Sequence, residues 1–282
     1  MEIKQRGNAF GYRLLLLAYN IFGYNLVVFI LNFVALYYLF FTPSVKKSMQ
    51  SYYRHQGLKL TSKAYFVHIK MFAVSIFDRF VSRIKPQDLT FCVHNKDLID
   101  LLNENGGVIL LSHVGSWASA AHCLMNELPP MSIVMRESTQ ENIHHVEKNN
   151  QRDNEQRVKI IDLNQGAIAA NIQIANALMN KELVAIMADR AVDKNKSVKV
   201  DFFNTKVIIN KNPFEIARRV KKPLVTIFVT NHSLKKYDLT LELIKESSIE
   251  QMAQDYTDIL EKKLKKYPNQ WYNFYDFFKG NN

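Results

Sequence analysis

Cysteine is scarce in this 282-residue chain, which contains only Cys92 and Cys123. Two thiols cannot form a disulfide framework, and so little cysteine is typical of a protein from a reducing compartment. Cys123 follows His122 in a predicted helix, so we expect it to be a helix residue rather than a nucleophile. His144 and His145 lie in a charged stretch that lacks the residue spacing of a metal site. We therefore expect no metal and no cofactor.

The chain also lacks internal repeats and low-complexity tracts. Hydrophobic residues make up 48% of it and charged residues 22%, which excludes a disordered protein and favours one large core, or a core with a small appendage. Lysine and arginine number 37 against 26 acidic residues, a formal charge of +11. Such an excess suits anionic lipid headgroups or an acidic carrier protein. Without a zinc spacing, a helix-turn-helix signature or an RNA-binding motif, we expect no nucleic acid partner.

Charge is absent between Arg13 and Lys46. Within this stretch, residues 21–41 are apolar and long enough to cross a bilayer. A cleavable signal peptide fits poorly, because the apolar run is long and no small-residue cleavage site follows it. Two asparagines leave open a helix that lies in the membrane interface, and a buried core helix is the alternative. We predict that residues 1–45 form an N-terminal apolar, membrane-associating helix.

Helical and strand patterns alternate over residues 46–282. This alternation predicts one α/β domain with a mixed sheet and helices on both faces. We expect helices over residues 62–84, 96–104, 117–127 and 167–179, and strands over residues 89–93, 131–135, 158–163, 183–187, 224–229 and 238–243, with a further strand leading to His113.

The apolar run 108–111 leads into Ser112-His113-Val114-Gly115-Ser116-Trp117. A strand here delivers an imidazole to the edge of a sheet, where open α/β sheets place their chemistry. Histidine titrates near neutral pH and can take a proton from a hydroxyl nucleophile. His113 is therefore the candidate general base. The alternative is a histidine that caps the following helix.

This motif resembles the first motif of the late (secondary) acyltransferases of lipid A biosynthesis, within the lysophospholipid acyltransferase superfamily. Similar blocks follow in the family's order and spacing, up to about residue 229. They lie at residues 133–137, 183–190, 198–204 and 212–229, with a looser similarity at residues 267–272.

The resemblance implies an enzyme that moves a fatty acyl group from acyl carrier protein or acyl-CoA to a hydroxyl of a lipid or glycolipid. It also implies the cytoplasmic face of the inner membrane, with His113 as base and no acyl-enzyme. The family has Asp or Glu five positions after this histidine, where the present chain has Ala118. A substitute acid must therefore come from elsewhere in the fold. We expect Asp189 at the end of a strand, or else Glu137.

The resemblance further implies a set of substrate-binding residues. Arg136 is expected to hold an anionic group of the acceptor, with a surface salt bridge as its alternative, and Asn204 replaces a family glycine at a turn where asparagine is tolerated. A non-catalytic relative that binds lipid or acyl carrier, or a hydrolase, stays open. The expected binding residues are Gly115, Ser116, Arg136, Arg190, Phe203 and Asn204.

Overall fold

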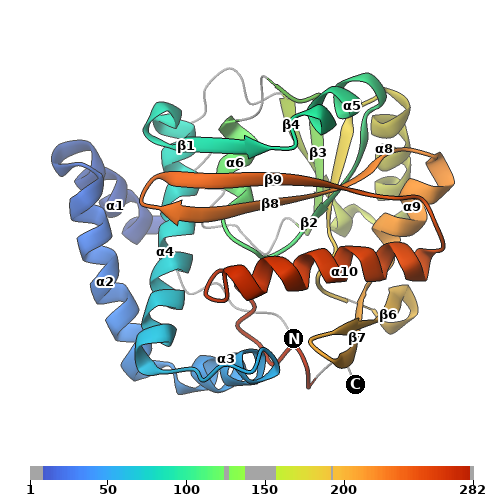
Figure 1. The fold of residues 1–282 in the computed structure, drawn as a ribbon. Helices are drawn as coiled ribbons and strands as arrows, with labels where there is room; N and C mark the ends of the chain where they lie inside the picture. Colours follow the sequence, from blue (N-terminus) through green and yellow to red (C-terminus); the bar gives the residue numbers. More distant parts are fainter. Residues whose placement is uncertain (1–8, 124–126, 137–156, 192, 280–282) are drawn as a thin grey trace.

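Figure 1 shows a computed structural model of the chain, which describes all residues except 1–8, 124–126, 137–156, 192 and 280–282, and the side chains of 9 and 121–123. Its strands are β1 (Thr90–His94), β2 (Gly107–Leu111), β3 (Met131–Met135), β4 (Val158–Asp162), β5 (Leu183–Met187), β6 (Ser197–Phe202), β7 (Thr205–Asn210), β8 (Leu224–Ser233) and β9 (Lys236–Ile244). Its α-helices are α1 (Ala9–Phe22), α2 (Tyr24–Phe41), α3 (Pro43–His55), α4 (Ser62–Ile84), α5 (Asp97–Asn105), α6 (Trp117–Cys123), α8 (Ala167–Met179), α9 (Asn212–Val220) and α10 (Ile249–Lys266).

Among the described residues, seven strands form one sheet in the order β1-β9-β8-β2-β5-β3-β4. The five strands from β8 to β4 are mutually parallel, whereas β9 pairs with β8 in the antiparallel direction and β1 runs parallel to β9. The prediction of a mixed sheet is thereby confirmed. The helix predicted over residues 62–84 and the strand over 183–187 have the predicted bounds, and most other elements differ by one to a few residues at their ends.

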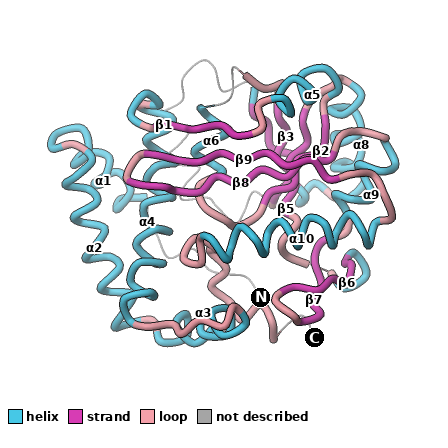
Figure 2. Tube along the Cα trace, in the orientation of Figure 1, coloured by secondary structure: helices cyan, strands magenta, loops and turns pink. Residues whose placement is uncertain are grey.

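Strand β2 is central to the sheet, and all five of its residues are buried. Alternate side chains of a strand point to opposite faces. Val108 and Leu110 pack into a core with α8, α9 and α10, whereas Ile109 and Leu111 pack into a second core with α4, α5 and α6. Helices therefore cover both faces of the sheet, as Figure 2 also shows.

The apolar N-terminal region forms two helices rather than one, because the chain breaks at Gly23 with φ of +80°. One helix of the described part, Tyr24–Phe41, is long and apolar enough to cross a membrane by length and composition, and 28% of it is buried. Tyr24 at its start donates hydrogen bonds of 2.8 and 3.0 Å to the two oxygens of Asp78 on α4. Helix α2 is thus packed along the α/β domain and held there by a buried polar contact.

A separate hairpin of β6 and β7 follows the main sheet's β5, and the sequence indicated only its first strand. Its turn consists of Phe203 and Asn204, which both have positive φ, of 48° and 58°. The left-handed conformation expected for Asn204 is therefore present. Two consecutive residues of this kind are typical of a tight hairpin turn that matches the twist of its strands.

Candidate active site

His113 and Asp189 lie at the carboxyl edge of two adjacent parallel strands. Strand β2 ends at Leu111 and β5 ends at Met187, and these two residues are partners in the β2–β5 register. His113 and Asp189 each follow the end of their strand by two positions. The register of the sheet therefore brings the two residues together, although 76 positions separate them in the sequence.

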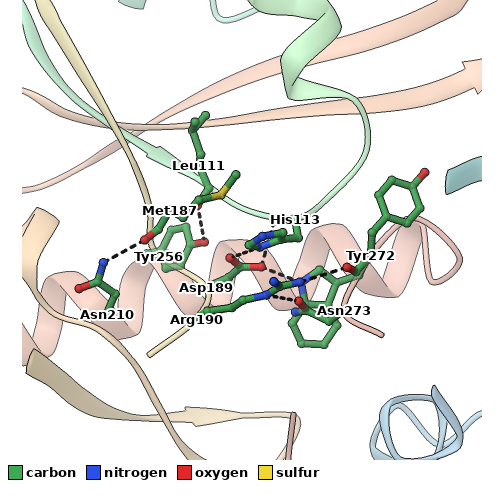
Figure 3. A network of polar contacts seen from close by, with 10 residues as sticks. Leu111, His113, Met187, Asp189, Arg190, Asn210, Tyr256, Tyr272 and Asn273 are labelled. Atoms are coloured by element: carbon green, nitrogen blue, oxygen red, sulfur yellow. Dashed lines mark hydrogen bonds and ion pairs between the residues drawn. The ribbon is translucent and has the colours of Figure 1, made fainter. Parts of the chain in front are cut away.

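The strand ends are also fixed by side chains from other elements. The carbonyl of Leu111 accepts a hydrogen bond of 3.4 Å from Tyr256 on α10, and the carbonyl of Met187 accepts one of 3.0 Å from Asn210 on β7 (Figure 3). Buried backbone carbonyls need such partners where strand pairing stops. These contacts hold the edge from which His113 and Asp189 project.

Asp189 binds His113 at two points. Its Oδ1 lies 2.8 Å from His113 Nδ1, and its Oδ2 accepts a 2.9 Å hydrogen bond from the His113 backbone amide (Figure 3). The Asp189 side chain is fully buried, whereas 25% of the His113 side chain is exposed. With the carboxylate accepting from Nδ1–H, the lone pair of a neutral imidazole lies on Nε2.

Trp271 is a third member of this site that sequence reasoning did not single out. Its indole Nε1–H donates a 2.9 Å hydrogen bond to Asp189 Oδ2. The Trp271 carbonyl in turn lies 2.9 Å from Nε2 of the buried His68, whose Nδ1 lies 3.2 Å from the Tyr53 hydroxyl. The stretch 267–272 had carried only a loose family similarity, and nothing in it indicated a contact with Asp189.

Burial and charge determine the ionisation of the pair. Burial would raise the pKa of Asp189, but the charge and hydrogen bond of His113, with Arg190 and Trp271, hold it well below its usual range. Burial and the nearby Arg190 lower the pKa of His113, against the opposing effect of Asp189. Burial also lowers the pKa of His68 to about 4, so that histidine is neutral at physiological pH. At neutral pH the site therefore holds a carboxylate and a neutral imidazole.

Gly115 and Ser116 shape the turn after His113. Gly115 has φ of +63°, and a Cβ built there would meet the Val229 carbonyl oxygen at 1.8 Å. The amide of Gly115 donates to the Gln270 carbonyl, and the amide of Ser116 donates to the Val229 carbonyl, both at 2.8 Å. These two amides are thus engaged within the protein and do not face a substrate.

The side chain of Ser116 is also engaged. Its hydroxyl lies 2.6 Å from the Ser119 hydroxyl and donates to the Ser75 carbonyl on α4 at 3.3 Å. Both serines are buried. These contacts and this burial are typical of packing residues rather than nucleophiles.

Arg190 lies beside the pair and holds the C-terminal segment. Its Nε donates to Asn273 Oδ1 at 2.5 Å and its Nη2 to the Tyr272 carbonyl at 3.1 Å (Figure 3). Its guanidinium carbon lies 5.2 Å from the centre of the Tyr275 ring. In this arrangement Arg190 orders the chain that carries Trp271 and balances the charge of Asp189.

The other expected residues lie at different distances from the His113–Asp189 pair. Arg136 is exposed directly after β3, at the same sheet edge, where Val134 pairs with Ile186. Glu137 lies outside the described residues. Phe203 is buried against Tyr52, which in turn contacts Trp271. Two other aromatic rings therefore lie between Phe203 and the His113–Asp189 pair. Asn204 is exposed at the hairpin turn.

An apolar pocket lies on the face of the sheet covered by α6 and reaches Leu111, the last residue of β2. Its walls include Leu111, Trp117, Met131 and Val229, and Arg157 supplies a charged side chain. The enclosed space is about 30 Å³, room for a water molecule or two. A longer apolar group therefore enters only if side chains of the wall move.

The fold and the site together define a mixed α/β protein with a histidine–carboxylate pair at the carboxyl edge of its parallel strands. Residues 61–280, most of the chain, match the family model described as bacterial lipid A biosynthesis acyltransferase, and the chain belongs to that family. A search of curated proteins finds no match. Membership implies acyltransferase activity with an acyl donor and a lipid acceptor, and the family is typically membrane-associated.

Proposed function

We propose that this protein transfers a fatty acyl group from an acyl thioester, carried by acyl carrier protein or coenzyme A, to a hydroxyl of a lipid or glycolipid. His113 is the general base. The observation that carries the proposal is the 2.8 Å contact between His113 Nδ1 and Asp189 Oδ1, with the His113 ring partly exposed. A base held on one nitrogen by a buried carboxylate presents its other nitrogen to a substrate hydroxyl.

In the proposed reaction, His113 Nε2 takes the proton of the acceptor hydroxyl as its oxygen attacks the thioester carbonyl. The tetrahedral intermediate then collapses to the ester and expels the thiolate, which takes the proton back from Nε2. Asp189 stabilises the transient imidazolium through Nδ1–H. No acyl-enzyme forms, and the side chains end the cycle as they began it.

Asp189 favours an enzyme over a non-catalytic relative. Ala118 cannot orient the imidazole, but Asp189 already occupies the Nδ1 side of His113 and carries a negative charge. Trp271 and the His113 amide both donate to the other oxygen of this carboxylate, Oδ2, and so fix it from further directions. A chain that had lost its function would have no need for a buried carboxylate with three protein donors, because burying such a charge is costly.

The proposed acyl chain lies in the apolar pocket beside Leu111, and Trp117 and Met131 are the wall residues that must move to admit it. Arg136, at the same sheet edge as His113 and Asp189, is proposed to bind an anionic group of the acceptor. The amides of Gly115 and Ser116 hold the turn that carries His113, so their proposed contribution to substrate binding is the shape of this turn.

The proposed location is the cytoplasmic face of the inner membrane. Helices α1 and α2 expose large apolar side chains over a continuous stretch of sequence, among them Phe10, Phe22, Phe29, Phe33 and Phe40. Exposed apolar surface of this kind marks a membrane or protein contact. Because α2 is also packed on α4 and bonded to Asp78, we propose that it lies against the bilayer with one face and against the domain with the other.

The test is an acyl-transfer assay with the full-length protein in lipid vesicles. Radiolabelled acyl thioester is supplied with and without lipid extract as acceptor, and both acylated lipid and free fatty acid are measured. The proposal expects labelled lipid only when acceptor is present. Free fatty acid without acceptor would instead show a hydrolase, and binding without either product would show a non-catalytic carrier- or lipid-binding protein.

A further inference from the structure

A second group of chemically reactive side chains lies on the sheet away from His113. Cys92 and His94 occupy alternate positions of the edge strand β1 and so point to the same face. Asp238 on β9 is the direct register partner of Cys92. The Cys92 sulfur, a His94 ring nitrogen and an Asp238 oxygen all lie within 4.8 Å of one another.

We propose that Cys92, His94 and Asp238 form a zinc site that joins β1 to β9. The thiolate and imidazole of this set are ligands that favour Zn²⁺ over Mg²⁺ or Ca²⁺. Three protein ligands with water in the fourth position make a tetrahedral centre. A sequence search for metal motifs misses this site, because its ligands come from strands that are distant in the sequence.

The geometry is close to what zinc needs. His94 Nε2 lies 3.2 Å from Asp238 Oδ1, and ligand atoms of a tetrahedral zinc lie about 3.5 Å apart, given bond lengths near 2.0 to 2.3 Å. Cys92 and His94 are exposed. A shift of the Cys92 sulfur by about 1 Å, made by turning its side chain, therefore completes the set without moving the backbone. Zinc would replace the direct contact between His94 and Asp238.

The surroundings of Asp238 support a ligand role. Its second oxygen accepts a 3.4 Å hydrogen bond from the Tyr267 hydroxyl, a contact that orients the carboxylate as outer partners of metal ligands do.

Two lysines near this face oppose a cation. Lys263 donates to Thr240 on β9 at 3.1 Å, and Lys266 lies over the Tyr267 ring at 5.1 Å. Both carry positive charge close to Asp238. We therefore expect moderate affinity, enough to stabilise the β1–β9 edge but below that of a closed four-ligand structural site.

Co²⁺ is a direct probe of the site in the full-length protein. One equivalent should give visible bands of tetrahedral cobalt and a thiolate-to-cobalt band in the near ultraviolet, and Zn²⁺ should abolish both. Cys92→Ser should remove the thiolate band, and His94→Ala or Asp238→Asn should weaken binding about tenfold or more. Cys123→Ser, which changes the other cysteine, is the matched control and should retain the spectrum.

Thermal unfolding gives a second readout. Zn²⁺ should raise the midpoint of the wild type and of Cys123→Ser, a chelator should reverse the rise, and Mg²⁺ should have no effect. Acyl transfer should not change in Cys92→Ser, because β1 lies three places from β2 in the sheet. A thiolate band that persists in Cys92→Ser, or the absence of any thiolate band in the wild type, would overturn the zinc site without bearing on the proposed acyl transfer.

Discussion

Asp189 accepts hydrogen bonds from both the ring and the backbone amide of His113, at 2.8 and 2.9 Å. The amide contact fixes the carboxylate relative to the backbone that carries the imidazole, so Asp189 is held to His113 at two points. The carboxylate that contacts His113 therefore follows the neighbouring strand β5, whereas Ala118 stands in the helix after the histidine.

His113→Ala should abolish acyl transfer while leaving the fold intact. Loss of a general base typically costs about 10²- to 10⁴-fold in turnover. In the wild type, kcat/KM should fall as the pH drops through the His113 pKa, and because this pKa is lowered, the midpoint should lie below the ordinary value of 6.5. Circular dichroism controls for folding. Activity of the variant within a few-fold of wild type would remove His113 from the mechanism.

Asp189→Asn should lower kcat by about 10²- to 10⁴-fold with little change in KM, since an amide cannot stabilise the imidazolium. Trp271→Phe keeps an aromatic ring but removes one donor to Asp189, and we expect a loss of about tenfold. Ala118→Glu should change little. If the wild type were inactive and Ala118→Glu gave transfer, the role proposed for Asp189 would be wrong.

Gly115→Ala should inactivate and destabilise the protein, because the added methyl group collides with the Val229 carbonyl and the residue has positive φ. Gly57→Ala is the matched control. Gly57 also has positive φ, of +71°, but nothing lies within 4 Å of the added Cβ. Thermal unfolding of both variants separates the collision from backbone strain, and equal losses in the two would show that the close contact at Gly115 is unimportant.

Asp78 should make stability fall as the pH rises. It is buried and bonded to Tyr24 and Tyr237, and burial raises its pKa to about 6, above its ordinary value of 3.8. The folded state therefore binds more protons than the unfolded state between these values. Ionisation of Asp78 lowers the free energy of unfolding by on the order of 2 to 4 kcal/mol. This loss is absent below pH 3.8 and complete above about pH 6. In Asp78→Asn, denaturant unfolding across this range should lose that slope.

The exposed face of α2 should bind membranes. Replacing Phe29, Phe33 and Phe40 together by glutamine should weaken binding to anionic vesicles by on the order of 10²- to 10³-fold. These substitutions are preferable to deleting the helix, because deletion also uncovers the buried face of α4. The control replaces three exposed apolar residues of α8, Ile168, Ile172 and Met179, by glutamine. Equal flotation of both variants with vesicles would exclude α2 as the anchor.

The amino-acid sequence by itself determined the kinds of elements and most of their positions. Local patterns can be recognised from the sequence without knowledge of the fold. Examples are the apolar period of residues 62–84, the short strand 183–187 and the strand before His113. The order of family-like blocks also indicated the family. The sequence did not indicate the break at Gly23, the helices Pro43–His55 and Ile249–Lys266, or the second hairpin strand, Thr205–Asn210.

Only the tertiary structure decided which groups surround His113. Asp189 meets the imidazole because β2 and β5 are adjacent and in register, and the order of parallel strands depends on contacts between distant segments. The same is true of Trp271, which follows the last helix and donates a hydrogen bond to Asp189. It is also true of the Gly115 and Ser116 amides, which donate to backbone carbonyls of the protein. A sequence shows where each strand ends, but packing determines which strand ends lie side by side.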